Sequence, residues 1–112
     1  MSRIAEAAFM AIVAADLANR FGEDNVFREP TLPSGRIPDF IAHGPAATWA
    51  VEVENDTDDL AQAVGQSQLY AAEYGSARHA EPLVYVPDPV EDYAELQVAR
   101  DVVRVLTLSP DP

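Results

Sequence analysis

The 112-residue sequence contains no cysteine and no lysine. The absence of cysteine excludes disulfide bonds, thiolate metal sites and cysteine nucleophiles. Zinc sites of the finger or ribbon type are excluded as well, because they are built on thiolates. A metal ion bound by this chain would therefore be a hard cation held by oxygen ligands.

The sequence also has no uninterrupted apolar run long enough for a membrane. Its N-terminal 22 residues are rich in alanine but contain Arg3, Glu6, Asp16 and Arg20. A membrane-spanning helix needs about 18 or more apolar residues, and a signal peptide needs an unbroken apolar core. We therefore expect a cytoplasmic protein with no membrane partner.

Basic residues are scarce, since 7 arginines stand against 19 acidic residues and the net charge is −12. Two explanations remain open. A salt-loving host, or a virus of such a host, selects acidic surfaces that are poor in lysine; alternatively, the acidity imitates or repels nucleic acid. The acids are spread along the chain, which favours the first explanation. The charge argues against avid nonspecific binding of DNA at low salt, so DNA contact would need a cation, local arginines or a partner protein.

The length and the 48% of hydrophobic residues predict a single domain over residues 1–112 with one real core. Apolar positions near a period of 3.6 predict helices over 3–20 and 56–74 and a short helix within 87–100. Apolar runs and alternation predict strands over 25–29, 36–42, 48–54, 82–86 and 101–108. The order α-β-β-β-α-β-(α)-β predicts an α/β fold, a mixed sheet flanked by helices.

Three carboxylates are expected to meet on one face of this sheet. Asp39 and Glu52 lie in consecutive predicted strands joined by a short turn, so they can face each other across an antiparallel ladder. Glu54 lies on the same face as Glu52, because side chains alternate with a period of 2. Such a group repels itself unless a cation is present, which suggests a site for Mg²⁺ or Mn²⁺.

The segment RIPDF, followed twelve residues after its aspartate by the acid of VEVEN, resembles the signature of the PD-(D/E)xK nucleases. Pro38-Asp39 corresponds to the PD and Glu52 to the acid. The segment QSQLY, from Gln66 to Tyr70, resembles the QxxxY motif of exonuclease-type and viral members. The resemblance extends from about Arg3 to Val86 and implies the restriction-endonuclease-like fold.

This resemblance implies a metal-dependent DNA endonuclease, a hydrolase of phosphodiester bonds. Asp39 and Glu52 would bind Mg²⁺ or Mn²⁺, and Glu6 would join the metal site through a water. Gln66 and Tyr70 would order the site or contact the substrate. The lysine of the family is replaced here by Glu54; a minority of restriction enzymes are similar, with a glutamate in that position as base or extra ligand.

The small size of the chain is similar to that of archaeal Holliday junction resolvases and of phage or halovirus nucleases. Ser34, a few residues before the PD in LPSGRIPDF, adds to the resemblance to the resolvases. Those enzymes act as dimers on branched DNA. The resemblance therefore implies a homodimer and DNA, including branched DNA, as partner.

Each candidate residue also has a purely structural interpretation. Asp39 could cap the turn after its strand, the ExE pair could be the solvated face of an edge strand, and Glu6 could be an ordinary surface residue. Gln66 and Tyr70 could pack their helix on the sheet, and His43 and His79 read more simply as exposed loop residues than as bases. The whole chain could accordingly be a nuclease-fold protein without catalysis, acting as a binding or inhibitory module, or an acidic mimic of DNA.

Overall fold

The computed structural model describes residues 6–75 and 79–110. These residues form ten elements in the order α1 (Glu6–Phe21), η1 (Glu23–Asn25), β1 (Val26–Arg28), β2 (Phe40–His43), β3 (Thr48–Val53), η2 (Thr57–Asp59), α2 (Leu60–Tyr74), β4 (Ala80–Pro87), α3 (Tyr93–Val102) and β5 (Arg104–Leu108). The predicted order of helices and strands is confirmed. Ile4, expected in the apolar face of the first helix, lies outside the described residues.

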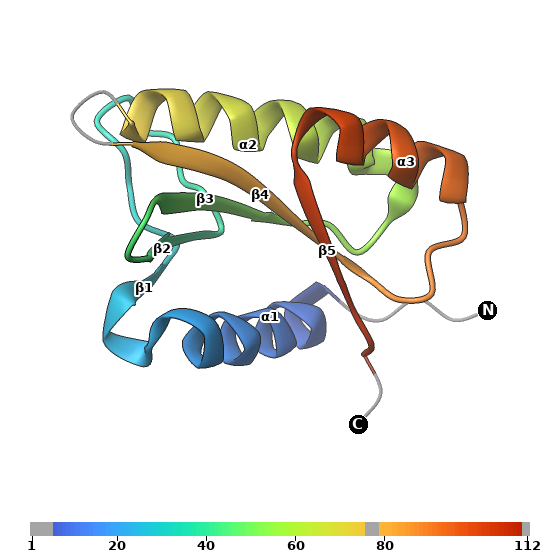
Figure 1. Ribbon diagram of the computed structural model, residues 1–112, viewed down its shortest axis with the longest axis horizontal. Helices are drawn as coiled ribbons and strands as arrows, with labels where there is room; N and C mark the ends of the chain where they lie inside the picture. Colours follow the sequence, from blue (N-terminus) through green and yellow to red (C-terminus); the bar gives the residue numbers. More distant parts are fainter. Residues whose placement is uncertain (1–5, 76–78, 111–112) are drawn as a thin grey trace.

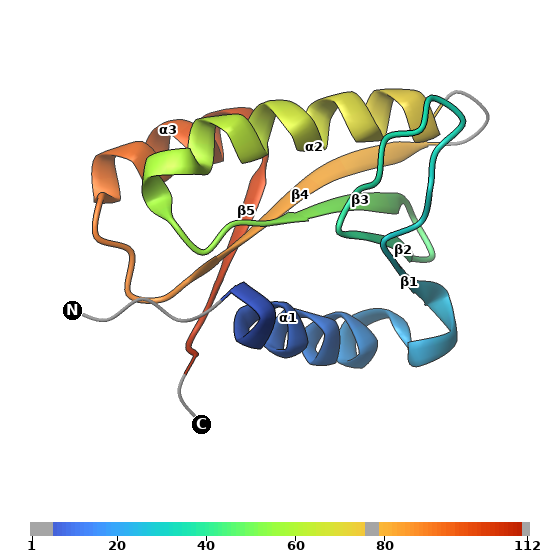
Figure 2. The same cartoon turned by 180° about the vertical axis from the view of Figure 1, so that it is seen from behind.

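The five strands form one mixed sheet in the order β1-β2-β3-β4-β5. Strands β1, β2 and β3 are an antiparallel meander, whereas β3, β4 and β5 run parallel. Parallel neighbours require a crossover connection, which α2 and α3 provide. Figures 1 and 2 show α1 on one face of the sheet and both crossover helices on the other. The predicted α/β class, a mixed sheet flanked by helices, is confirmed.

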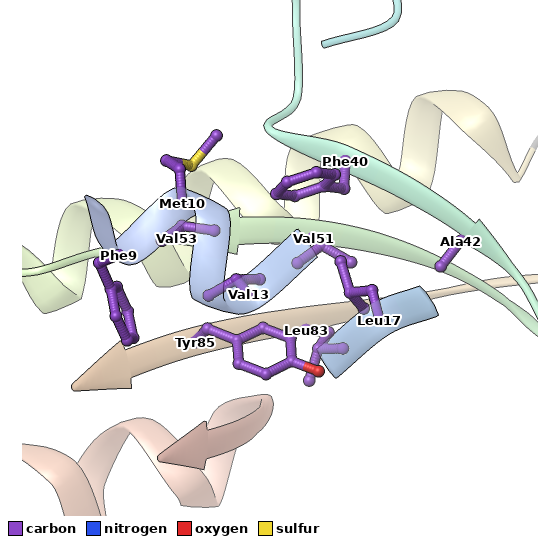
Figure 3. Close-up of a cluster of buried hydrophobic side chains, with 10 residues drawn as sticks. All are labelled: Phe9, Met10, Val13, Leu17, Phe40, Ala42, Val51, Val53, Leu83 and Tyr85. Atoms are coloured by element: carbon purple, nitrogen blue, oxygen red, sulfur yellow. The ribbon is translucent and has the colours of Figure 1, made fainter. Parts of the chain in front are cut away.

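The face of the sheet beneath α1 carries one half of the core. Alternate residues of the central strands point to it, so that they meet the buried side of α1 (Figure 3). This cluster comprises Phe9, Met10, Val13, Leu17, Phe40, Ala42, Val51, Val53, Leu83 and Tyr85. The predicted helix core at Phe9, Val13 and Leu17 is thus present, and Ile12 packs at its edge.

The opposite face is covered by α2 and α3 and carries the other half of the core. Val84 and Val86 of β4 meet Leu60, Ala63 and Val64 of α2 and Leu96 of α3. Ile41 of β2 and Ala50 of β3 pack near the end of α2. Because helices cover both faces, β3 has five buried residues out of six and lacks the solvated face that its alternating sequence suggested.

Three predicted boundaries are wrong by three residues or more. The last strand begins at Arg104 rather than at residue 101, because α3 continues to Val102. Strand β2 begins at Phe40 rather than at residue 36, because the preceding segment folds back on itself: the Leu32 amide donates to the Arg36 carbonyl at 2.8 Å. Helix α2 begins at Leu60, after the 3-10 turn η2. Asp56 caps that turn, since its Oδ1 accepts a hydrogen bond from the Asp58 amide at 3.0 Å.

The buried hydroxyl of Tyr85 gives a first prediction. It donates to Asp16 Oδ2 at 2.7 Å, tying β4 to α1. Burial raises the pKa of this phenol, so it remains a donor at any ordinary pH. Tyr85→Phe should lower the free energy of unfolding by about 1–2 kcal/mol in urea titrations, the usual cost of leaving a hydrogen-bond partner unsatisfied. Tyr93→Phe, at an exposed position, is the control; equal losses in both variants would contradict the assignment.

Candidate metal and active site

Asp39 and Glu52 lie opposite each other where β2 begins and β3 ends. The register of this antiparallel pair matches Phe40 with Val51, so positions 39 and 52 are the next opposed positions outward. Phe40 and Val51 belong to the core beneath α1. Because side chains alternate along a strand, Asp39 and Glu52 both project to the face covered by α2. The structure therefore brings together the two acids that the sequence singled out.

Backbone amides hold both carboxylates in place. Asp39 Oδ2 accepts a hydrogen bond from the Val53 amide at 2.7 Å. In return, the Asp39 amide donates to Glu52 Oε1 at 3.3 Å. These two contacts continue the cross-strand pairing beyond the end of the ladder through side chains. The turn-capping interpretation of Asp39 is therefore wrong, because its carboxylate bonds to β3 rather than to the turn after β2.

Glu52 is buried, with only 8% of its surface exposed. The alternative in which it lies on a solvated edge strand is wrong, because β3 is the central strand of the sheet and α2 covers it. A buried carboxylate loses its hydration, and a second carboxylate beside it adds repulsion. The sequence pattern alone could not show this, since an ExE alternation looks the same on an edge strand and on a covered one.

The electrostatics of the pair follow from this burial. Loss of hydration raises the pKa of Glu52 to about 8, and the charge of Asp39 adds to the effect. Burial likewise raises the pKa of Asp39, with further contributions from the charges of Glu6 and Glu29. The raised pKa of both acids therefore favours a proton shared by the metal-free pair near neutral pH. A bound cation would compete with that proton for the site.

Glu54 follows β3 directly and lies at the margin of the same site. Its amide donates to the Tyr85 carbonyl at 2.9 Å, and its Oε1 accepts from the Asp56 amide at 3.0 Å. Partial burial raises the pKa of Glu54, and the charges of Asp59 and Glu6 raise it further. The position that holds lysine in the nuclease family is thus occupied by a half-buried acid with an elevated proton affinity.

Glu6 is exposed on the first turn of α1, yet it acts on the site through its charge. That charge raises the pKa of both Asp39 and Glu54. Its position follows from packing, because Phe9 and Met10, one turn further on, share a cluster with Val53 at the end of β3 (Figure 3). Glu6 is therefore close enough to act on the acids through its charge, whereas its role in holding a metal-bound water stays a prediction.

Tyr70 approaches the carboxylate pair from α2. Its hydroxyl pKa is raised by burial and then by the charges of Glu52 and Asp39, so the phenol lies within reach of their electrostatic field. Its ring packs against the cluster of Ile41 and Ala50. Tyr70 can therefore hold α2 on the sheet and also contribute to the site. Gln66, half buried, lies one turn earlier on the same side of the helix.

An ion-pair network that the sequence did not reveal holds the loop before Asp39. Glu73, one turn after Tyr70 on α2, accepts from the Ser34 amide at 2.9 Å, from the Ser34 hydroxyl at 2.6 Å and from Arg36 Nη1 at 3.0 Å. The hydrogen bonds from Ser34 lower the pKa of Glu73 and favour its charged form. The only signal of this network in the sequence was helical spacing, because positions 70 and 73 lie on the same face of α2.

The two histidines differ from each other in their surroundings. His43 is not an exposed loop residue: it ends β2 and is half buried, with Nδ1 at 3.1 Å from the Thr48 hydroxyl and Nε2 at 3.3 Å from the Tyr74 hydroxyl. His79 is exposed, as expected, and lies 2.7 Å from Glu81 Oε1. Both therefore have structural partners away from the carboxylate pair.

The donor set of the site suits magnesium or manganese. These cations commonly take one or two protein carboxylates and complete their shell with water and substrate phosphate. Asp39 and Glu52 match that requirement. Within residues 6–75 and 79–110, no group of three or more His, Cys, Asp or Glu side chains is arranged to hold an ion. The expected grouping of Asp39, Glu52 and Glu54 as a three-carboxylate metal site is therefore not found among these residues. A cation here would rest on Asp39 and Glu52 and draw its other ligands from solvent and substrate.

Comparison of the chain with protein-family models, with curated proteins and with solved structures finds no match. Among the described residues, no helix is long and apolar enough to cross a membrane. The function therefore has to be argued from the carboxylate site and its surroundings.

Proposed function

We propose that this protein is a Mg²⁺- or Mn²⁺-dependent DNA endonuclease in which Asp39 and Glu52 hold the cation. The observation that supports this most directly is the opposed pair of carboxylates where β2 begins and β3 ends, with Glu52 buried and Asp39 half buried. The element order around the pair is the one that the resemblance to PD-(D/E)xK nucleases implies. Branched DNA is the proposed substrate, and a homodimer the proposed assembly.

A purely structural role does not explain why two carboxylates are placed opposite each other here. An apolar residue at position 52 would pack against α2 without a desolvation penalty, whereas glutamate there must keep a proton. A divalent cation offsets the repulsion between the two acids. When bound, it would neutralise charge on the scissile phosphate and activate a water for phosphodiester hydrolysis.

The chain's own residues would complete the chemistry. The Val53 amide fixes Asp39, so the carboxylate is oriented before substrate arrives. Glu54, with its raised pKa, would accept a proton from the attacking water. Tyr70 would donate a hydrogen bond at the site, and Glu6 would add negative charge that favours cation binding. A cation would also reduce the repulsion between DNA and a chain of net charge −12.

Titration calorimetry with Mn²⁺ is the deciding experiment for the metal site, carried out at low and at molar salt. Wild type is expected to bind, and Asp39→Asn is expected to lose binding because it removes one of two carboxylate ligands. Asp58→Asn, which removes an exposed acid from η2, is the control for net charge and should bind like wild type. Mn²⁺-dependent cleavage of four-way junctions and of linear duplexes then tests the reaction. Binding that is indifferent to Asp39→Asn would refute the site.

A second candidate function is a nuclease fold without catalysis, serving as a binding or inhibitory module or as an acidic DNA mimic. The observations that favour it are Glu54 in place of lysine and a proton on Glu52 near neutral pH. It predicts no Mn²⁺ binding at any salt. It further predicts capture of a basic DNA-binding partner that moderate salt releases and that Asp39→Asn leaves unchanged.

A further inference from the structure

A second site lies on the opposite face of the sheet from the carboxylates. A cavity of about 330 Å³ opens between the C-terminal end of α1 and strands β3, β4 and β5; it is lined by Arg20, Phe21, Trp49, Leu83, Arg104 and Leu106. Trp49 and Leu83 share the face of Val51, beneath α1, whereas Glu52 points to α2. This volume lies within the range of small-ligand pockets.

Arginine side chains gather at this cavity in an otherwise acidic molecule, with acids among them. A neighbouring hollow of about 470 Å³ shares Trp49 and Arg104 with it and adds Arg100, along with Glu81 and Asp101. Three of the five arginines in the described residues thus surround one tryptophan. Within those residues, neither Arg100 nor Arg104 has a carboxylate within ion-pair distance. Their charge is therefore available to a bound anion.

The individual contacts define what the cavity can recognise. The Arg104 guanidinium lies over the Trp49 ring at 5.7 Å from its centroid, a cation–π arrangement in which both planar groups line the cavity. Asp16 holds Arg20 through Nε at 2.7 Å and so fixes this second guanidinium at the rim. Phe21, Leu83 and Leu106 supply an apolar lining. A ligand suited to this lining has a flat aromatic part and an anionic part.

We propose that this cavity binds a nucleotide, with its base stacked on the Arg104–Trp49 surface and its phosphate held by the arginines. Arginine suits both contacts, since its planar fork stacks on rings and pairs bidentately with phosphate. The nucleotide is either free or part of a single strand, because the same chemistry is present in both. The site does not depend on the carboxylate pair, which lies on the other face of the sheet.

Fluorescence provides a direct test, because Trp49 is the only tryptophan in the chain. Titration with dAMP is expected to change its emission saturably, and adenosine and inorganic phosphate should each bind more weakly. Arg104→Gln should weaken dAMP binding about tenfold, the scale of losing a charge-assisted contact. Arg28→Gln, at an exposed arginine of β1, is the matched control and should bind like wild type. Thermal melts verify that both variants fold.

Two further comparisons extend the test. The first distinguishes a free nucleotide from a DNA strand as the ligand, and the second asks whether the cavity binds independently of the carboxylate pair. A short oligo(dA) that binds more tightly than dAMP identifies a DNA strand as the ligand, whereas equal affinity identifies the free nucleotide; either result supports the site. Asp39→Asn should leave dAMP binding unchanged, so failure of the nuclease proposal would not affect this one. No saturable response to either probe, or equal affinity of Arg104→Gln and Arg28→Gln, would overturn it.

Discussion

Glu52→Gln is expected to stabilise the metal-free protein at pH 8 while leaving it little changed at pH 4. Glutamate 52 titrates near 8 in the folded chain, against an ordinary value of 4.5. Between these values the folded state binds more protons than the unfolded state, so stability falls as pH rises through this window. Each pKa unit corresponds to about 1.4 kcal/mol, so the full difference amounts to a few kcal/mol.

Glutamine removes the group that titrates but keeps a similar shape, and its side-chain amide can donate to Asp39 as the protonated acid does. The melting temperature of wild type should therefore decline from pH 5 to pH 8 by several degrees more than that of Glu52→Gln. Glu23→Gln, at an exposed acid of η1, controls for the change in net charge. Parallel pH profiles for wild type and Glu52→Gln would show that folding does not raise the pKa of this carboxyl.

If the site binds metal, added Mn²⁺ should reverse the order of stability, so that wild type becomes more stable than Glu52→Gln. At pH 8 the cation should raise the melting temperature of wild type, because a ligand that binds only the folded state stabilises it. Glu52→Gln, with one carboxylate ligand removed, should respond far less. The same variant thus links the cost of burying Glu52 to its proposed use as a ligand of a cation.

Much of this arrangement could be predicted from the sequence, because it depends on local periodicity. Alternation over 48–54 and the short turn before it predict the antiparallel pairing of β2 with β3. The register that sets Asp39 opposite Glu52 is one residue from the predicted strand bounds, because His43 still belongs to β2 and pairs with Thr48. The crossover helix 56–74 between two strands likewise predicts a parallel pair. These inferences needed no knowledge of the rest of the sheet.

The environment of the pair could not be predicted, because it depends on segments remote in sequence. Whether Glu52 is solvated or buried depends on β4 and α2, which cover β3 only once the sheet is assembled. The attachment of Ser34 and Arg36 to Glu73 spans more than 35 residues and follows no periodic signal. The proposed nucleotide pocket could not be predicted for the same reason, because Arg20, Trp49 and Arg104 come from three separate elements.

Glu54→Gln is expected to lower the rate of DNA cleavage at least about 100-fold at saturating Mn²⁺, the usual contribution of a general base. Partial burial and neighbouring charges raise the pKa of Glu54 above its ordinary value, which makes its carboxylate a stronger base. Glutamine cannot accept a proton, although its side-chain oxygen can still accept the hydrogen bond from the Asp56 amide. The fold and Mn²⁺ affinity should therefore persist while turnover is lost.

Single-turnover cleavage of a labelled junction, with Asp58→Asn as a control for the loss of one nearby acid, isolates this effect. Wild type and the control should share a rate that rises with pH as Glu54 loses its proton, whereas the residual rate of Glu54→Gln should lose that dependence. A variant that cleaves as fast as wild type would exclude Glu54 from proton transfer. In the proposed mechanism, catalysis would then rest on Asp39 and Glu52 with a bound cation.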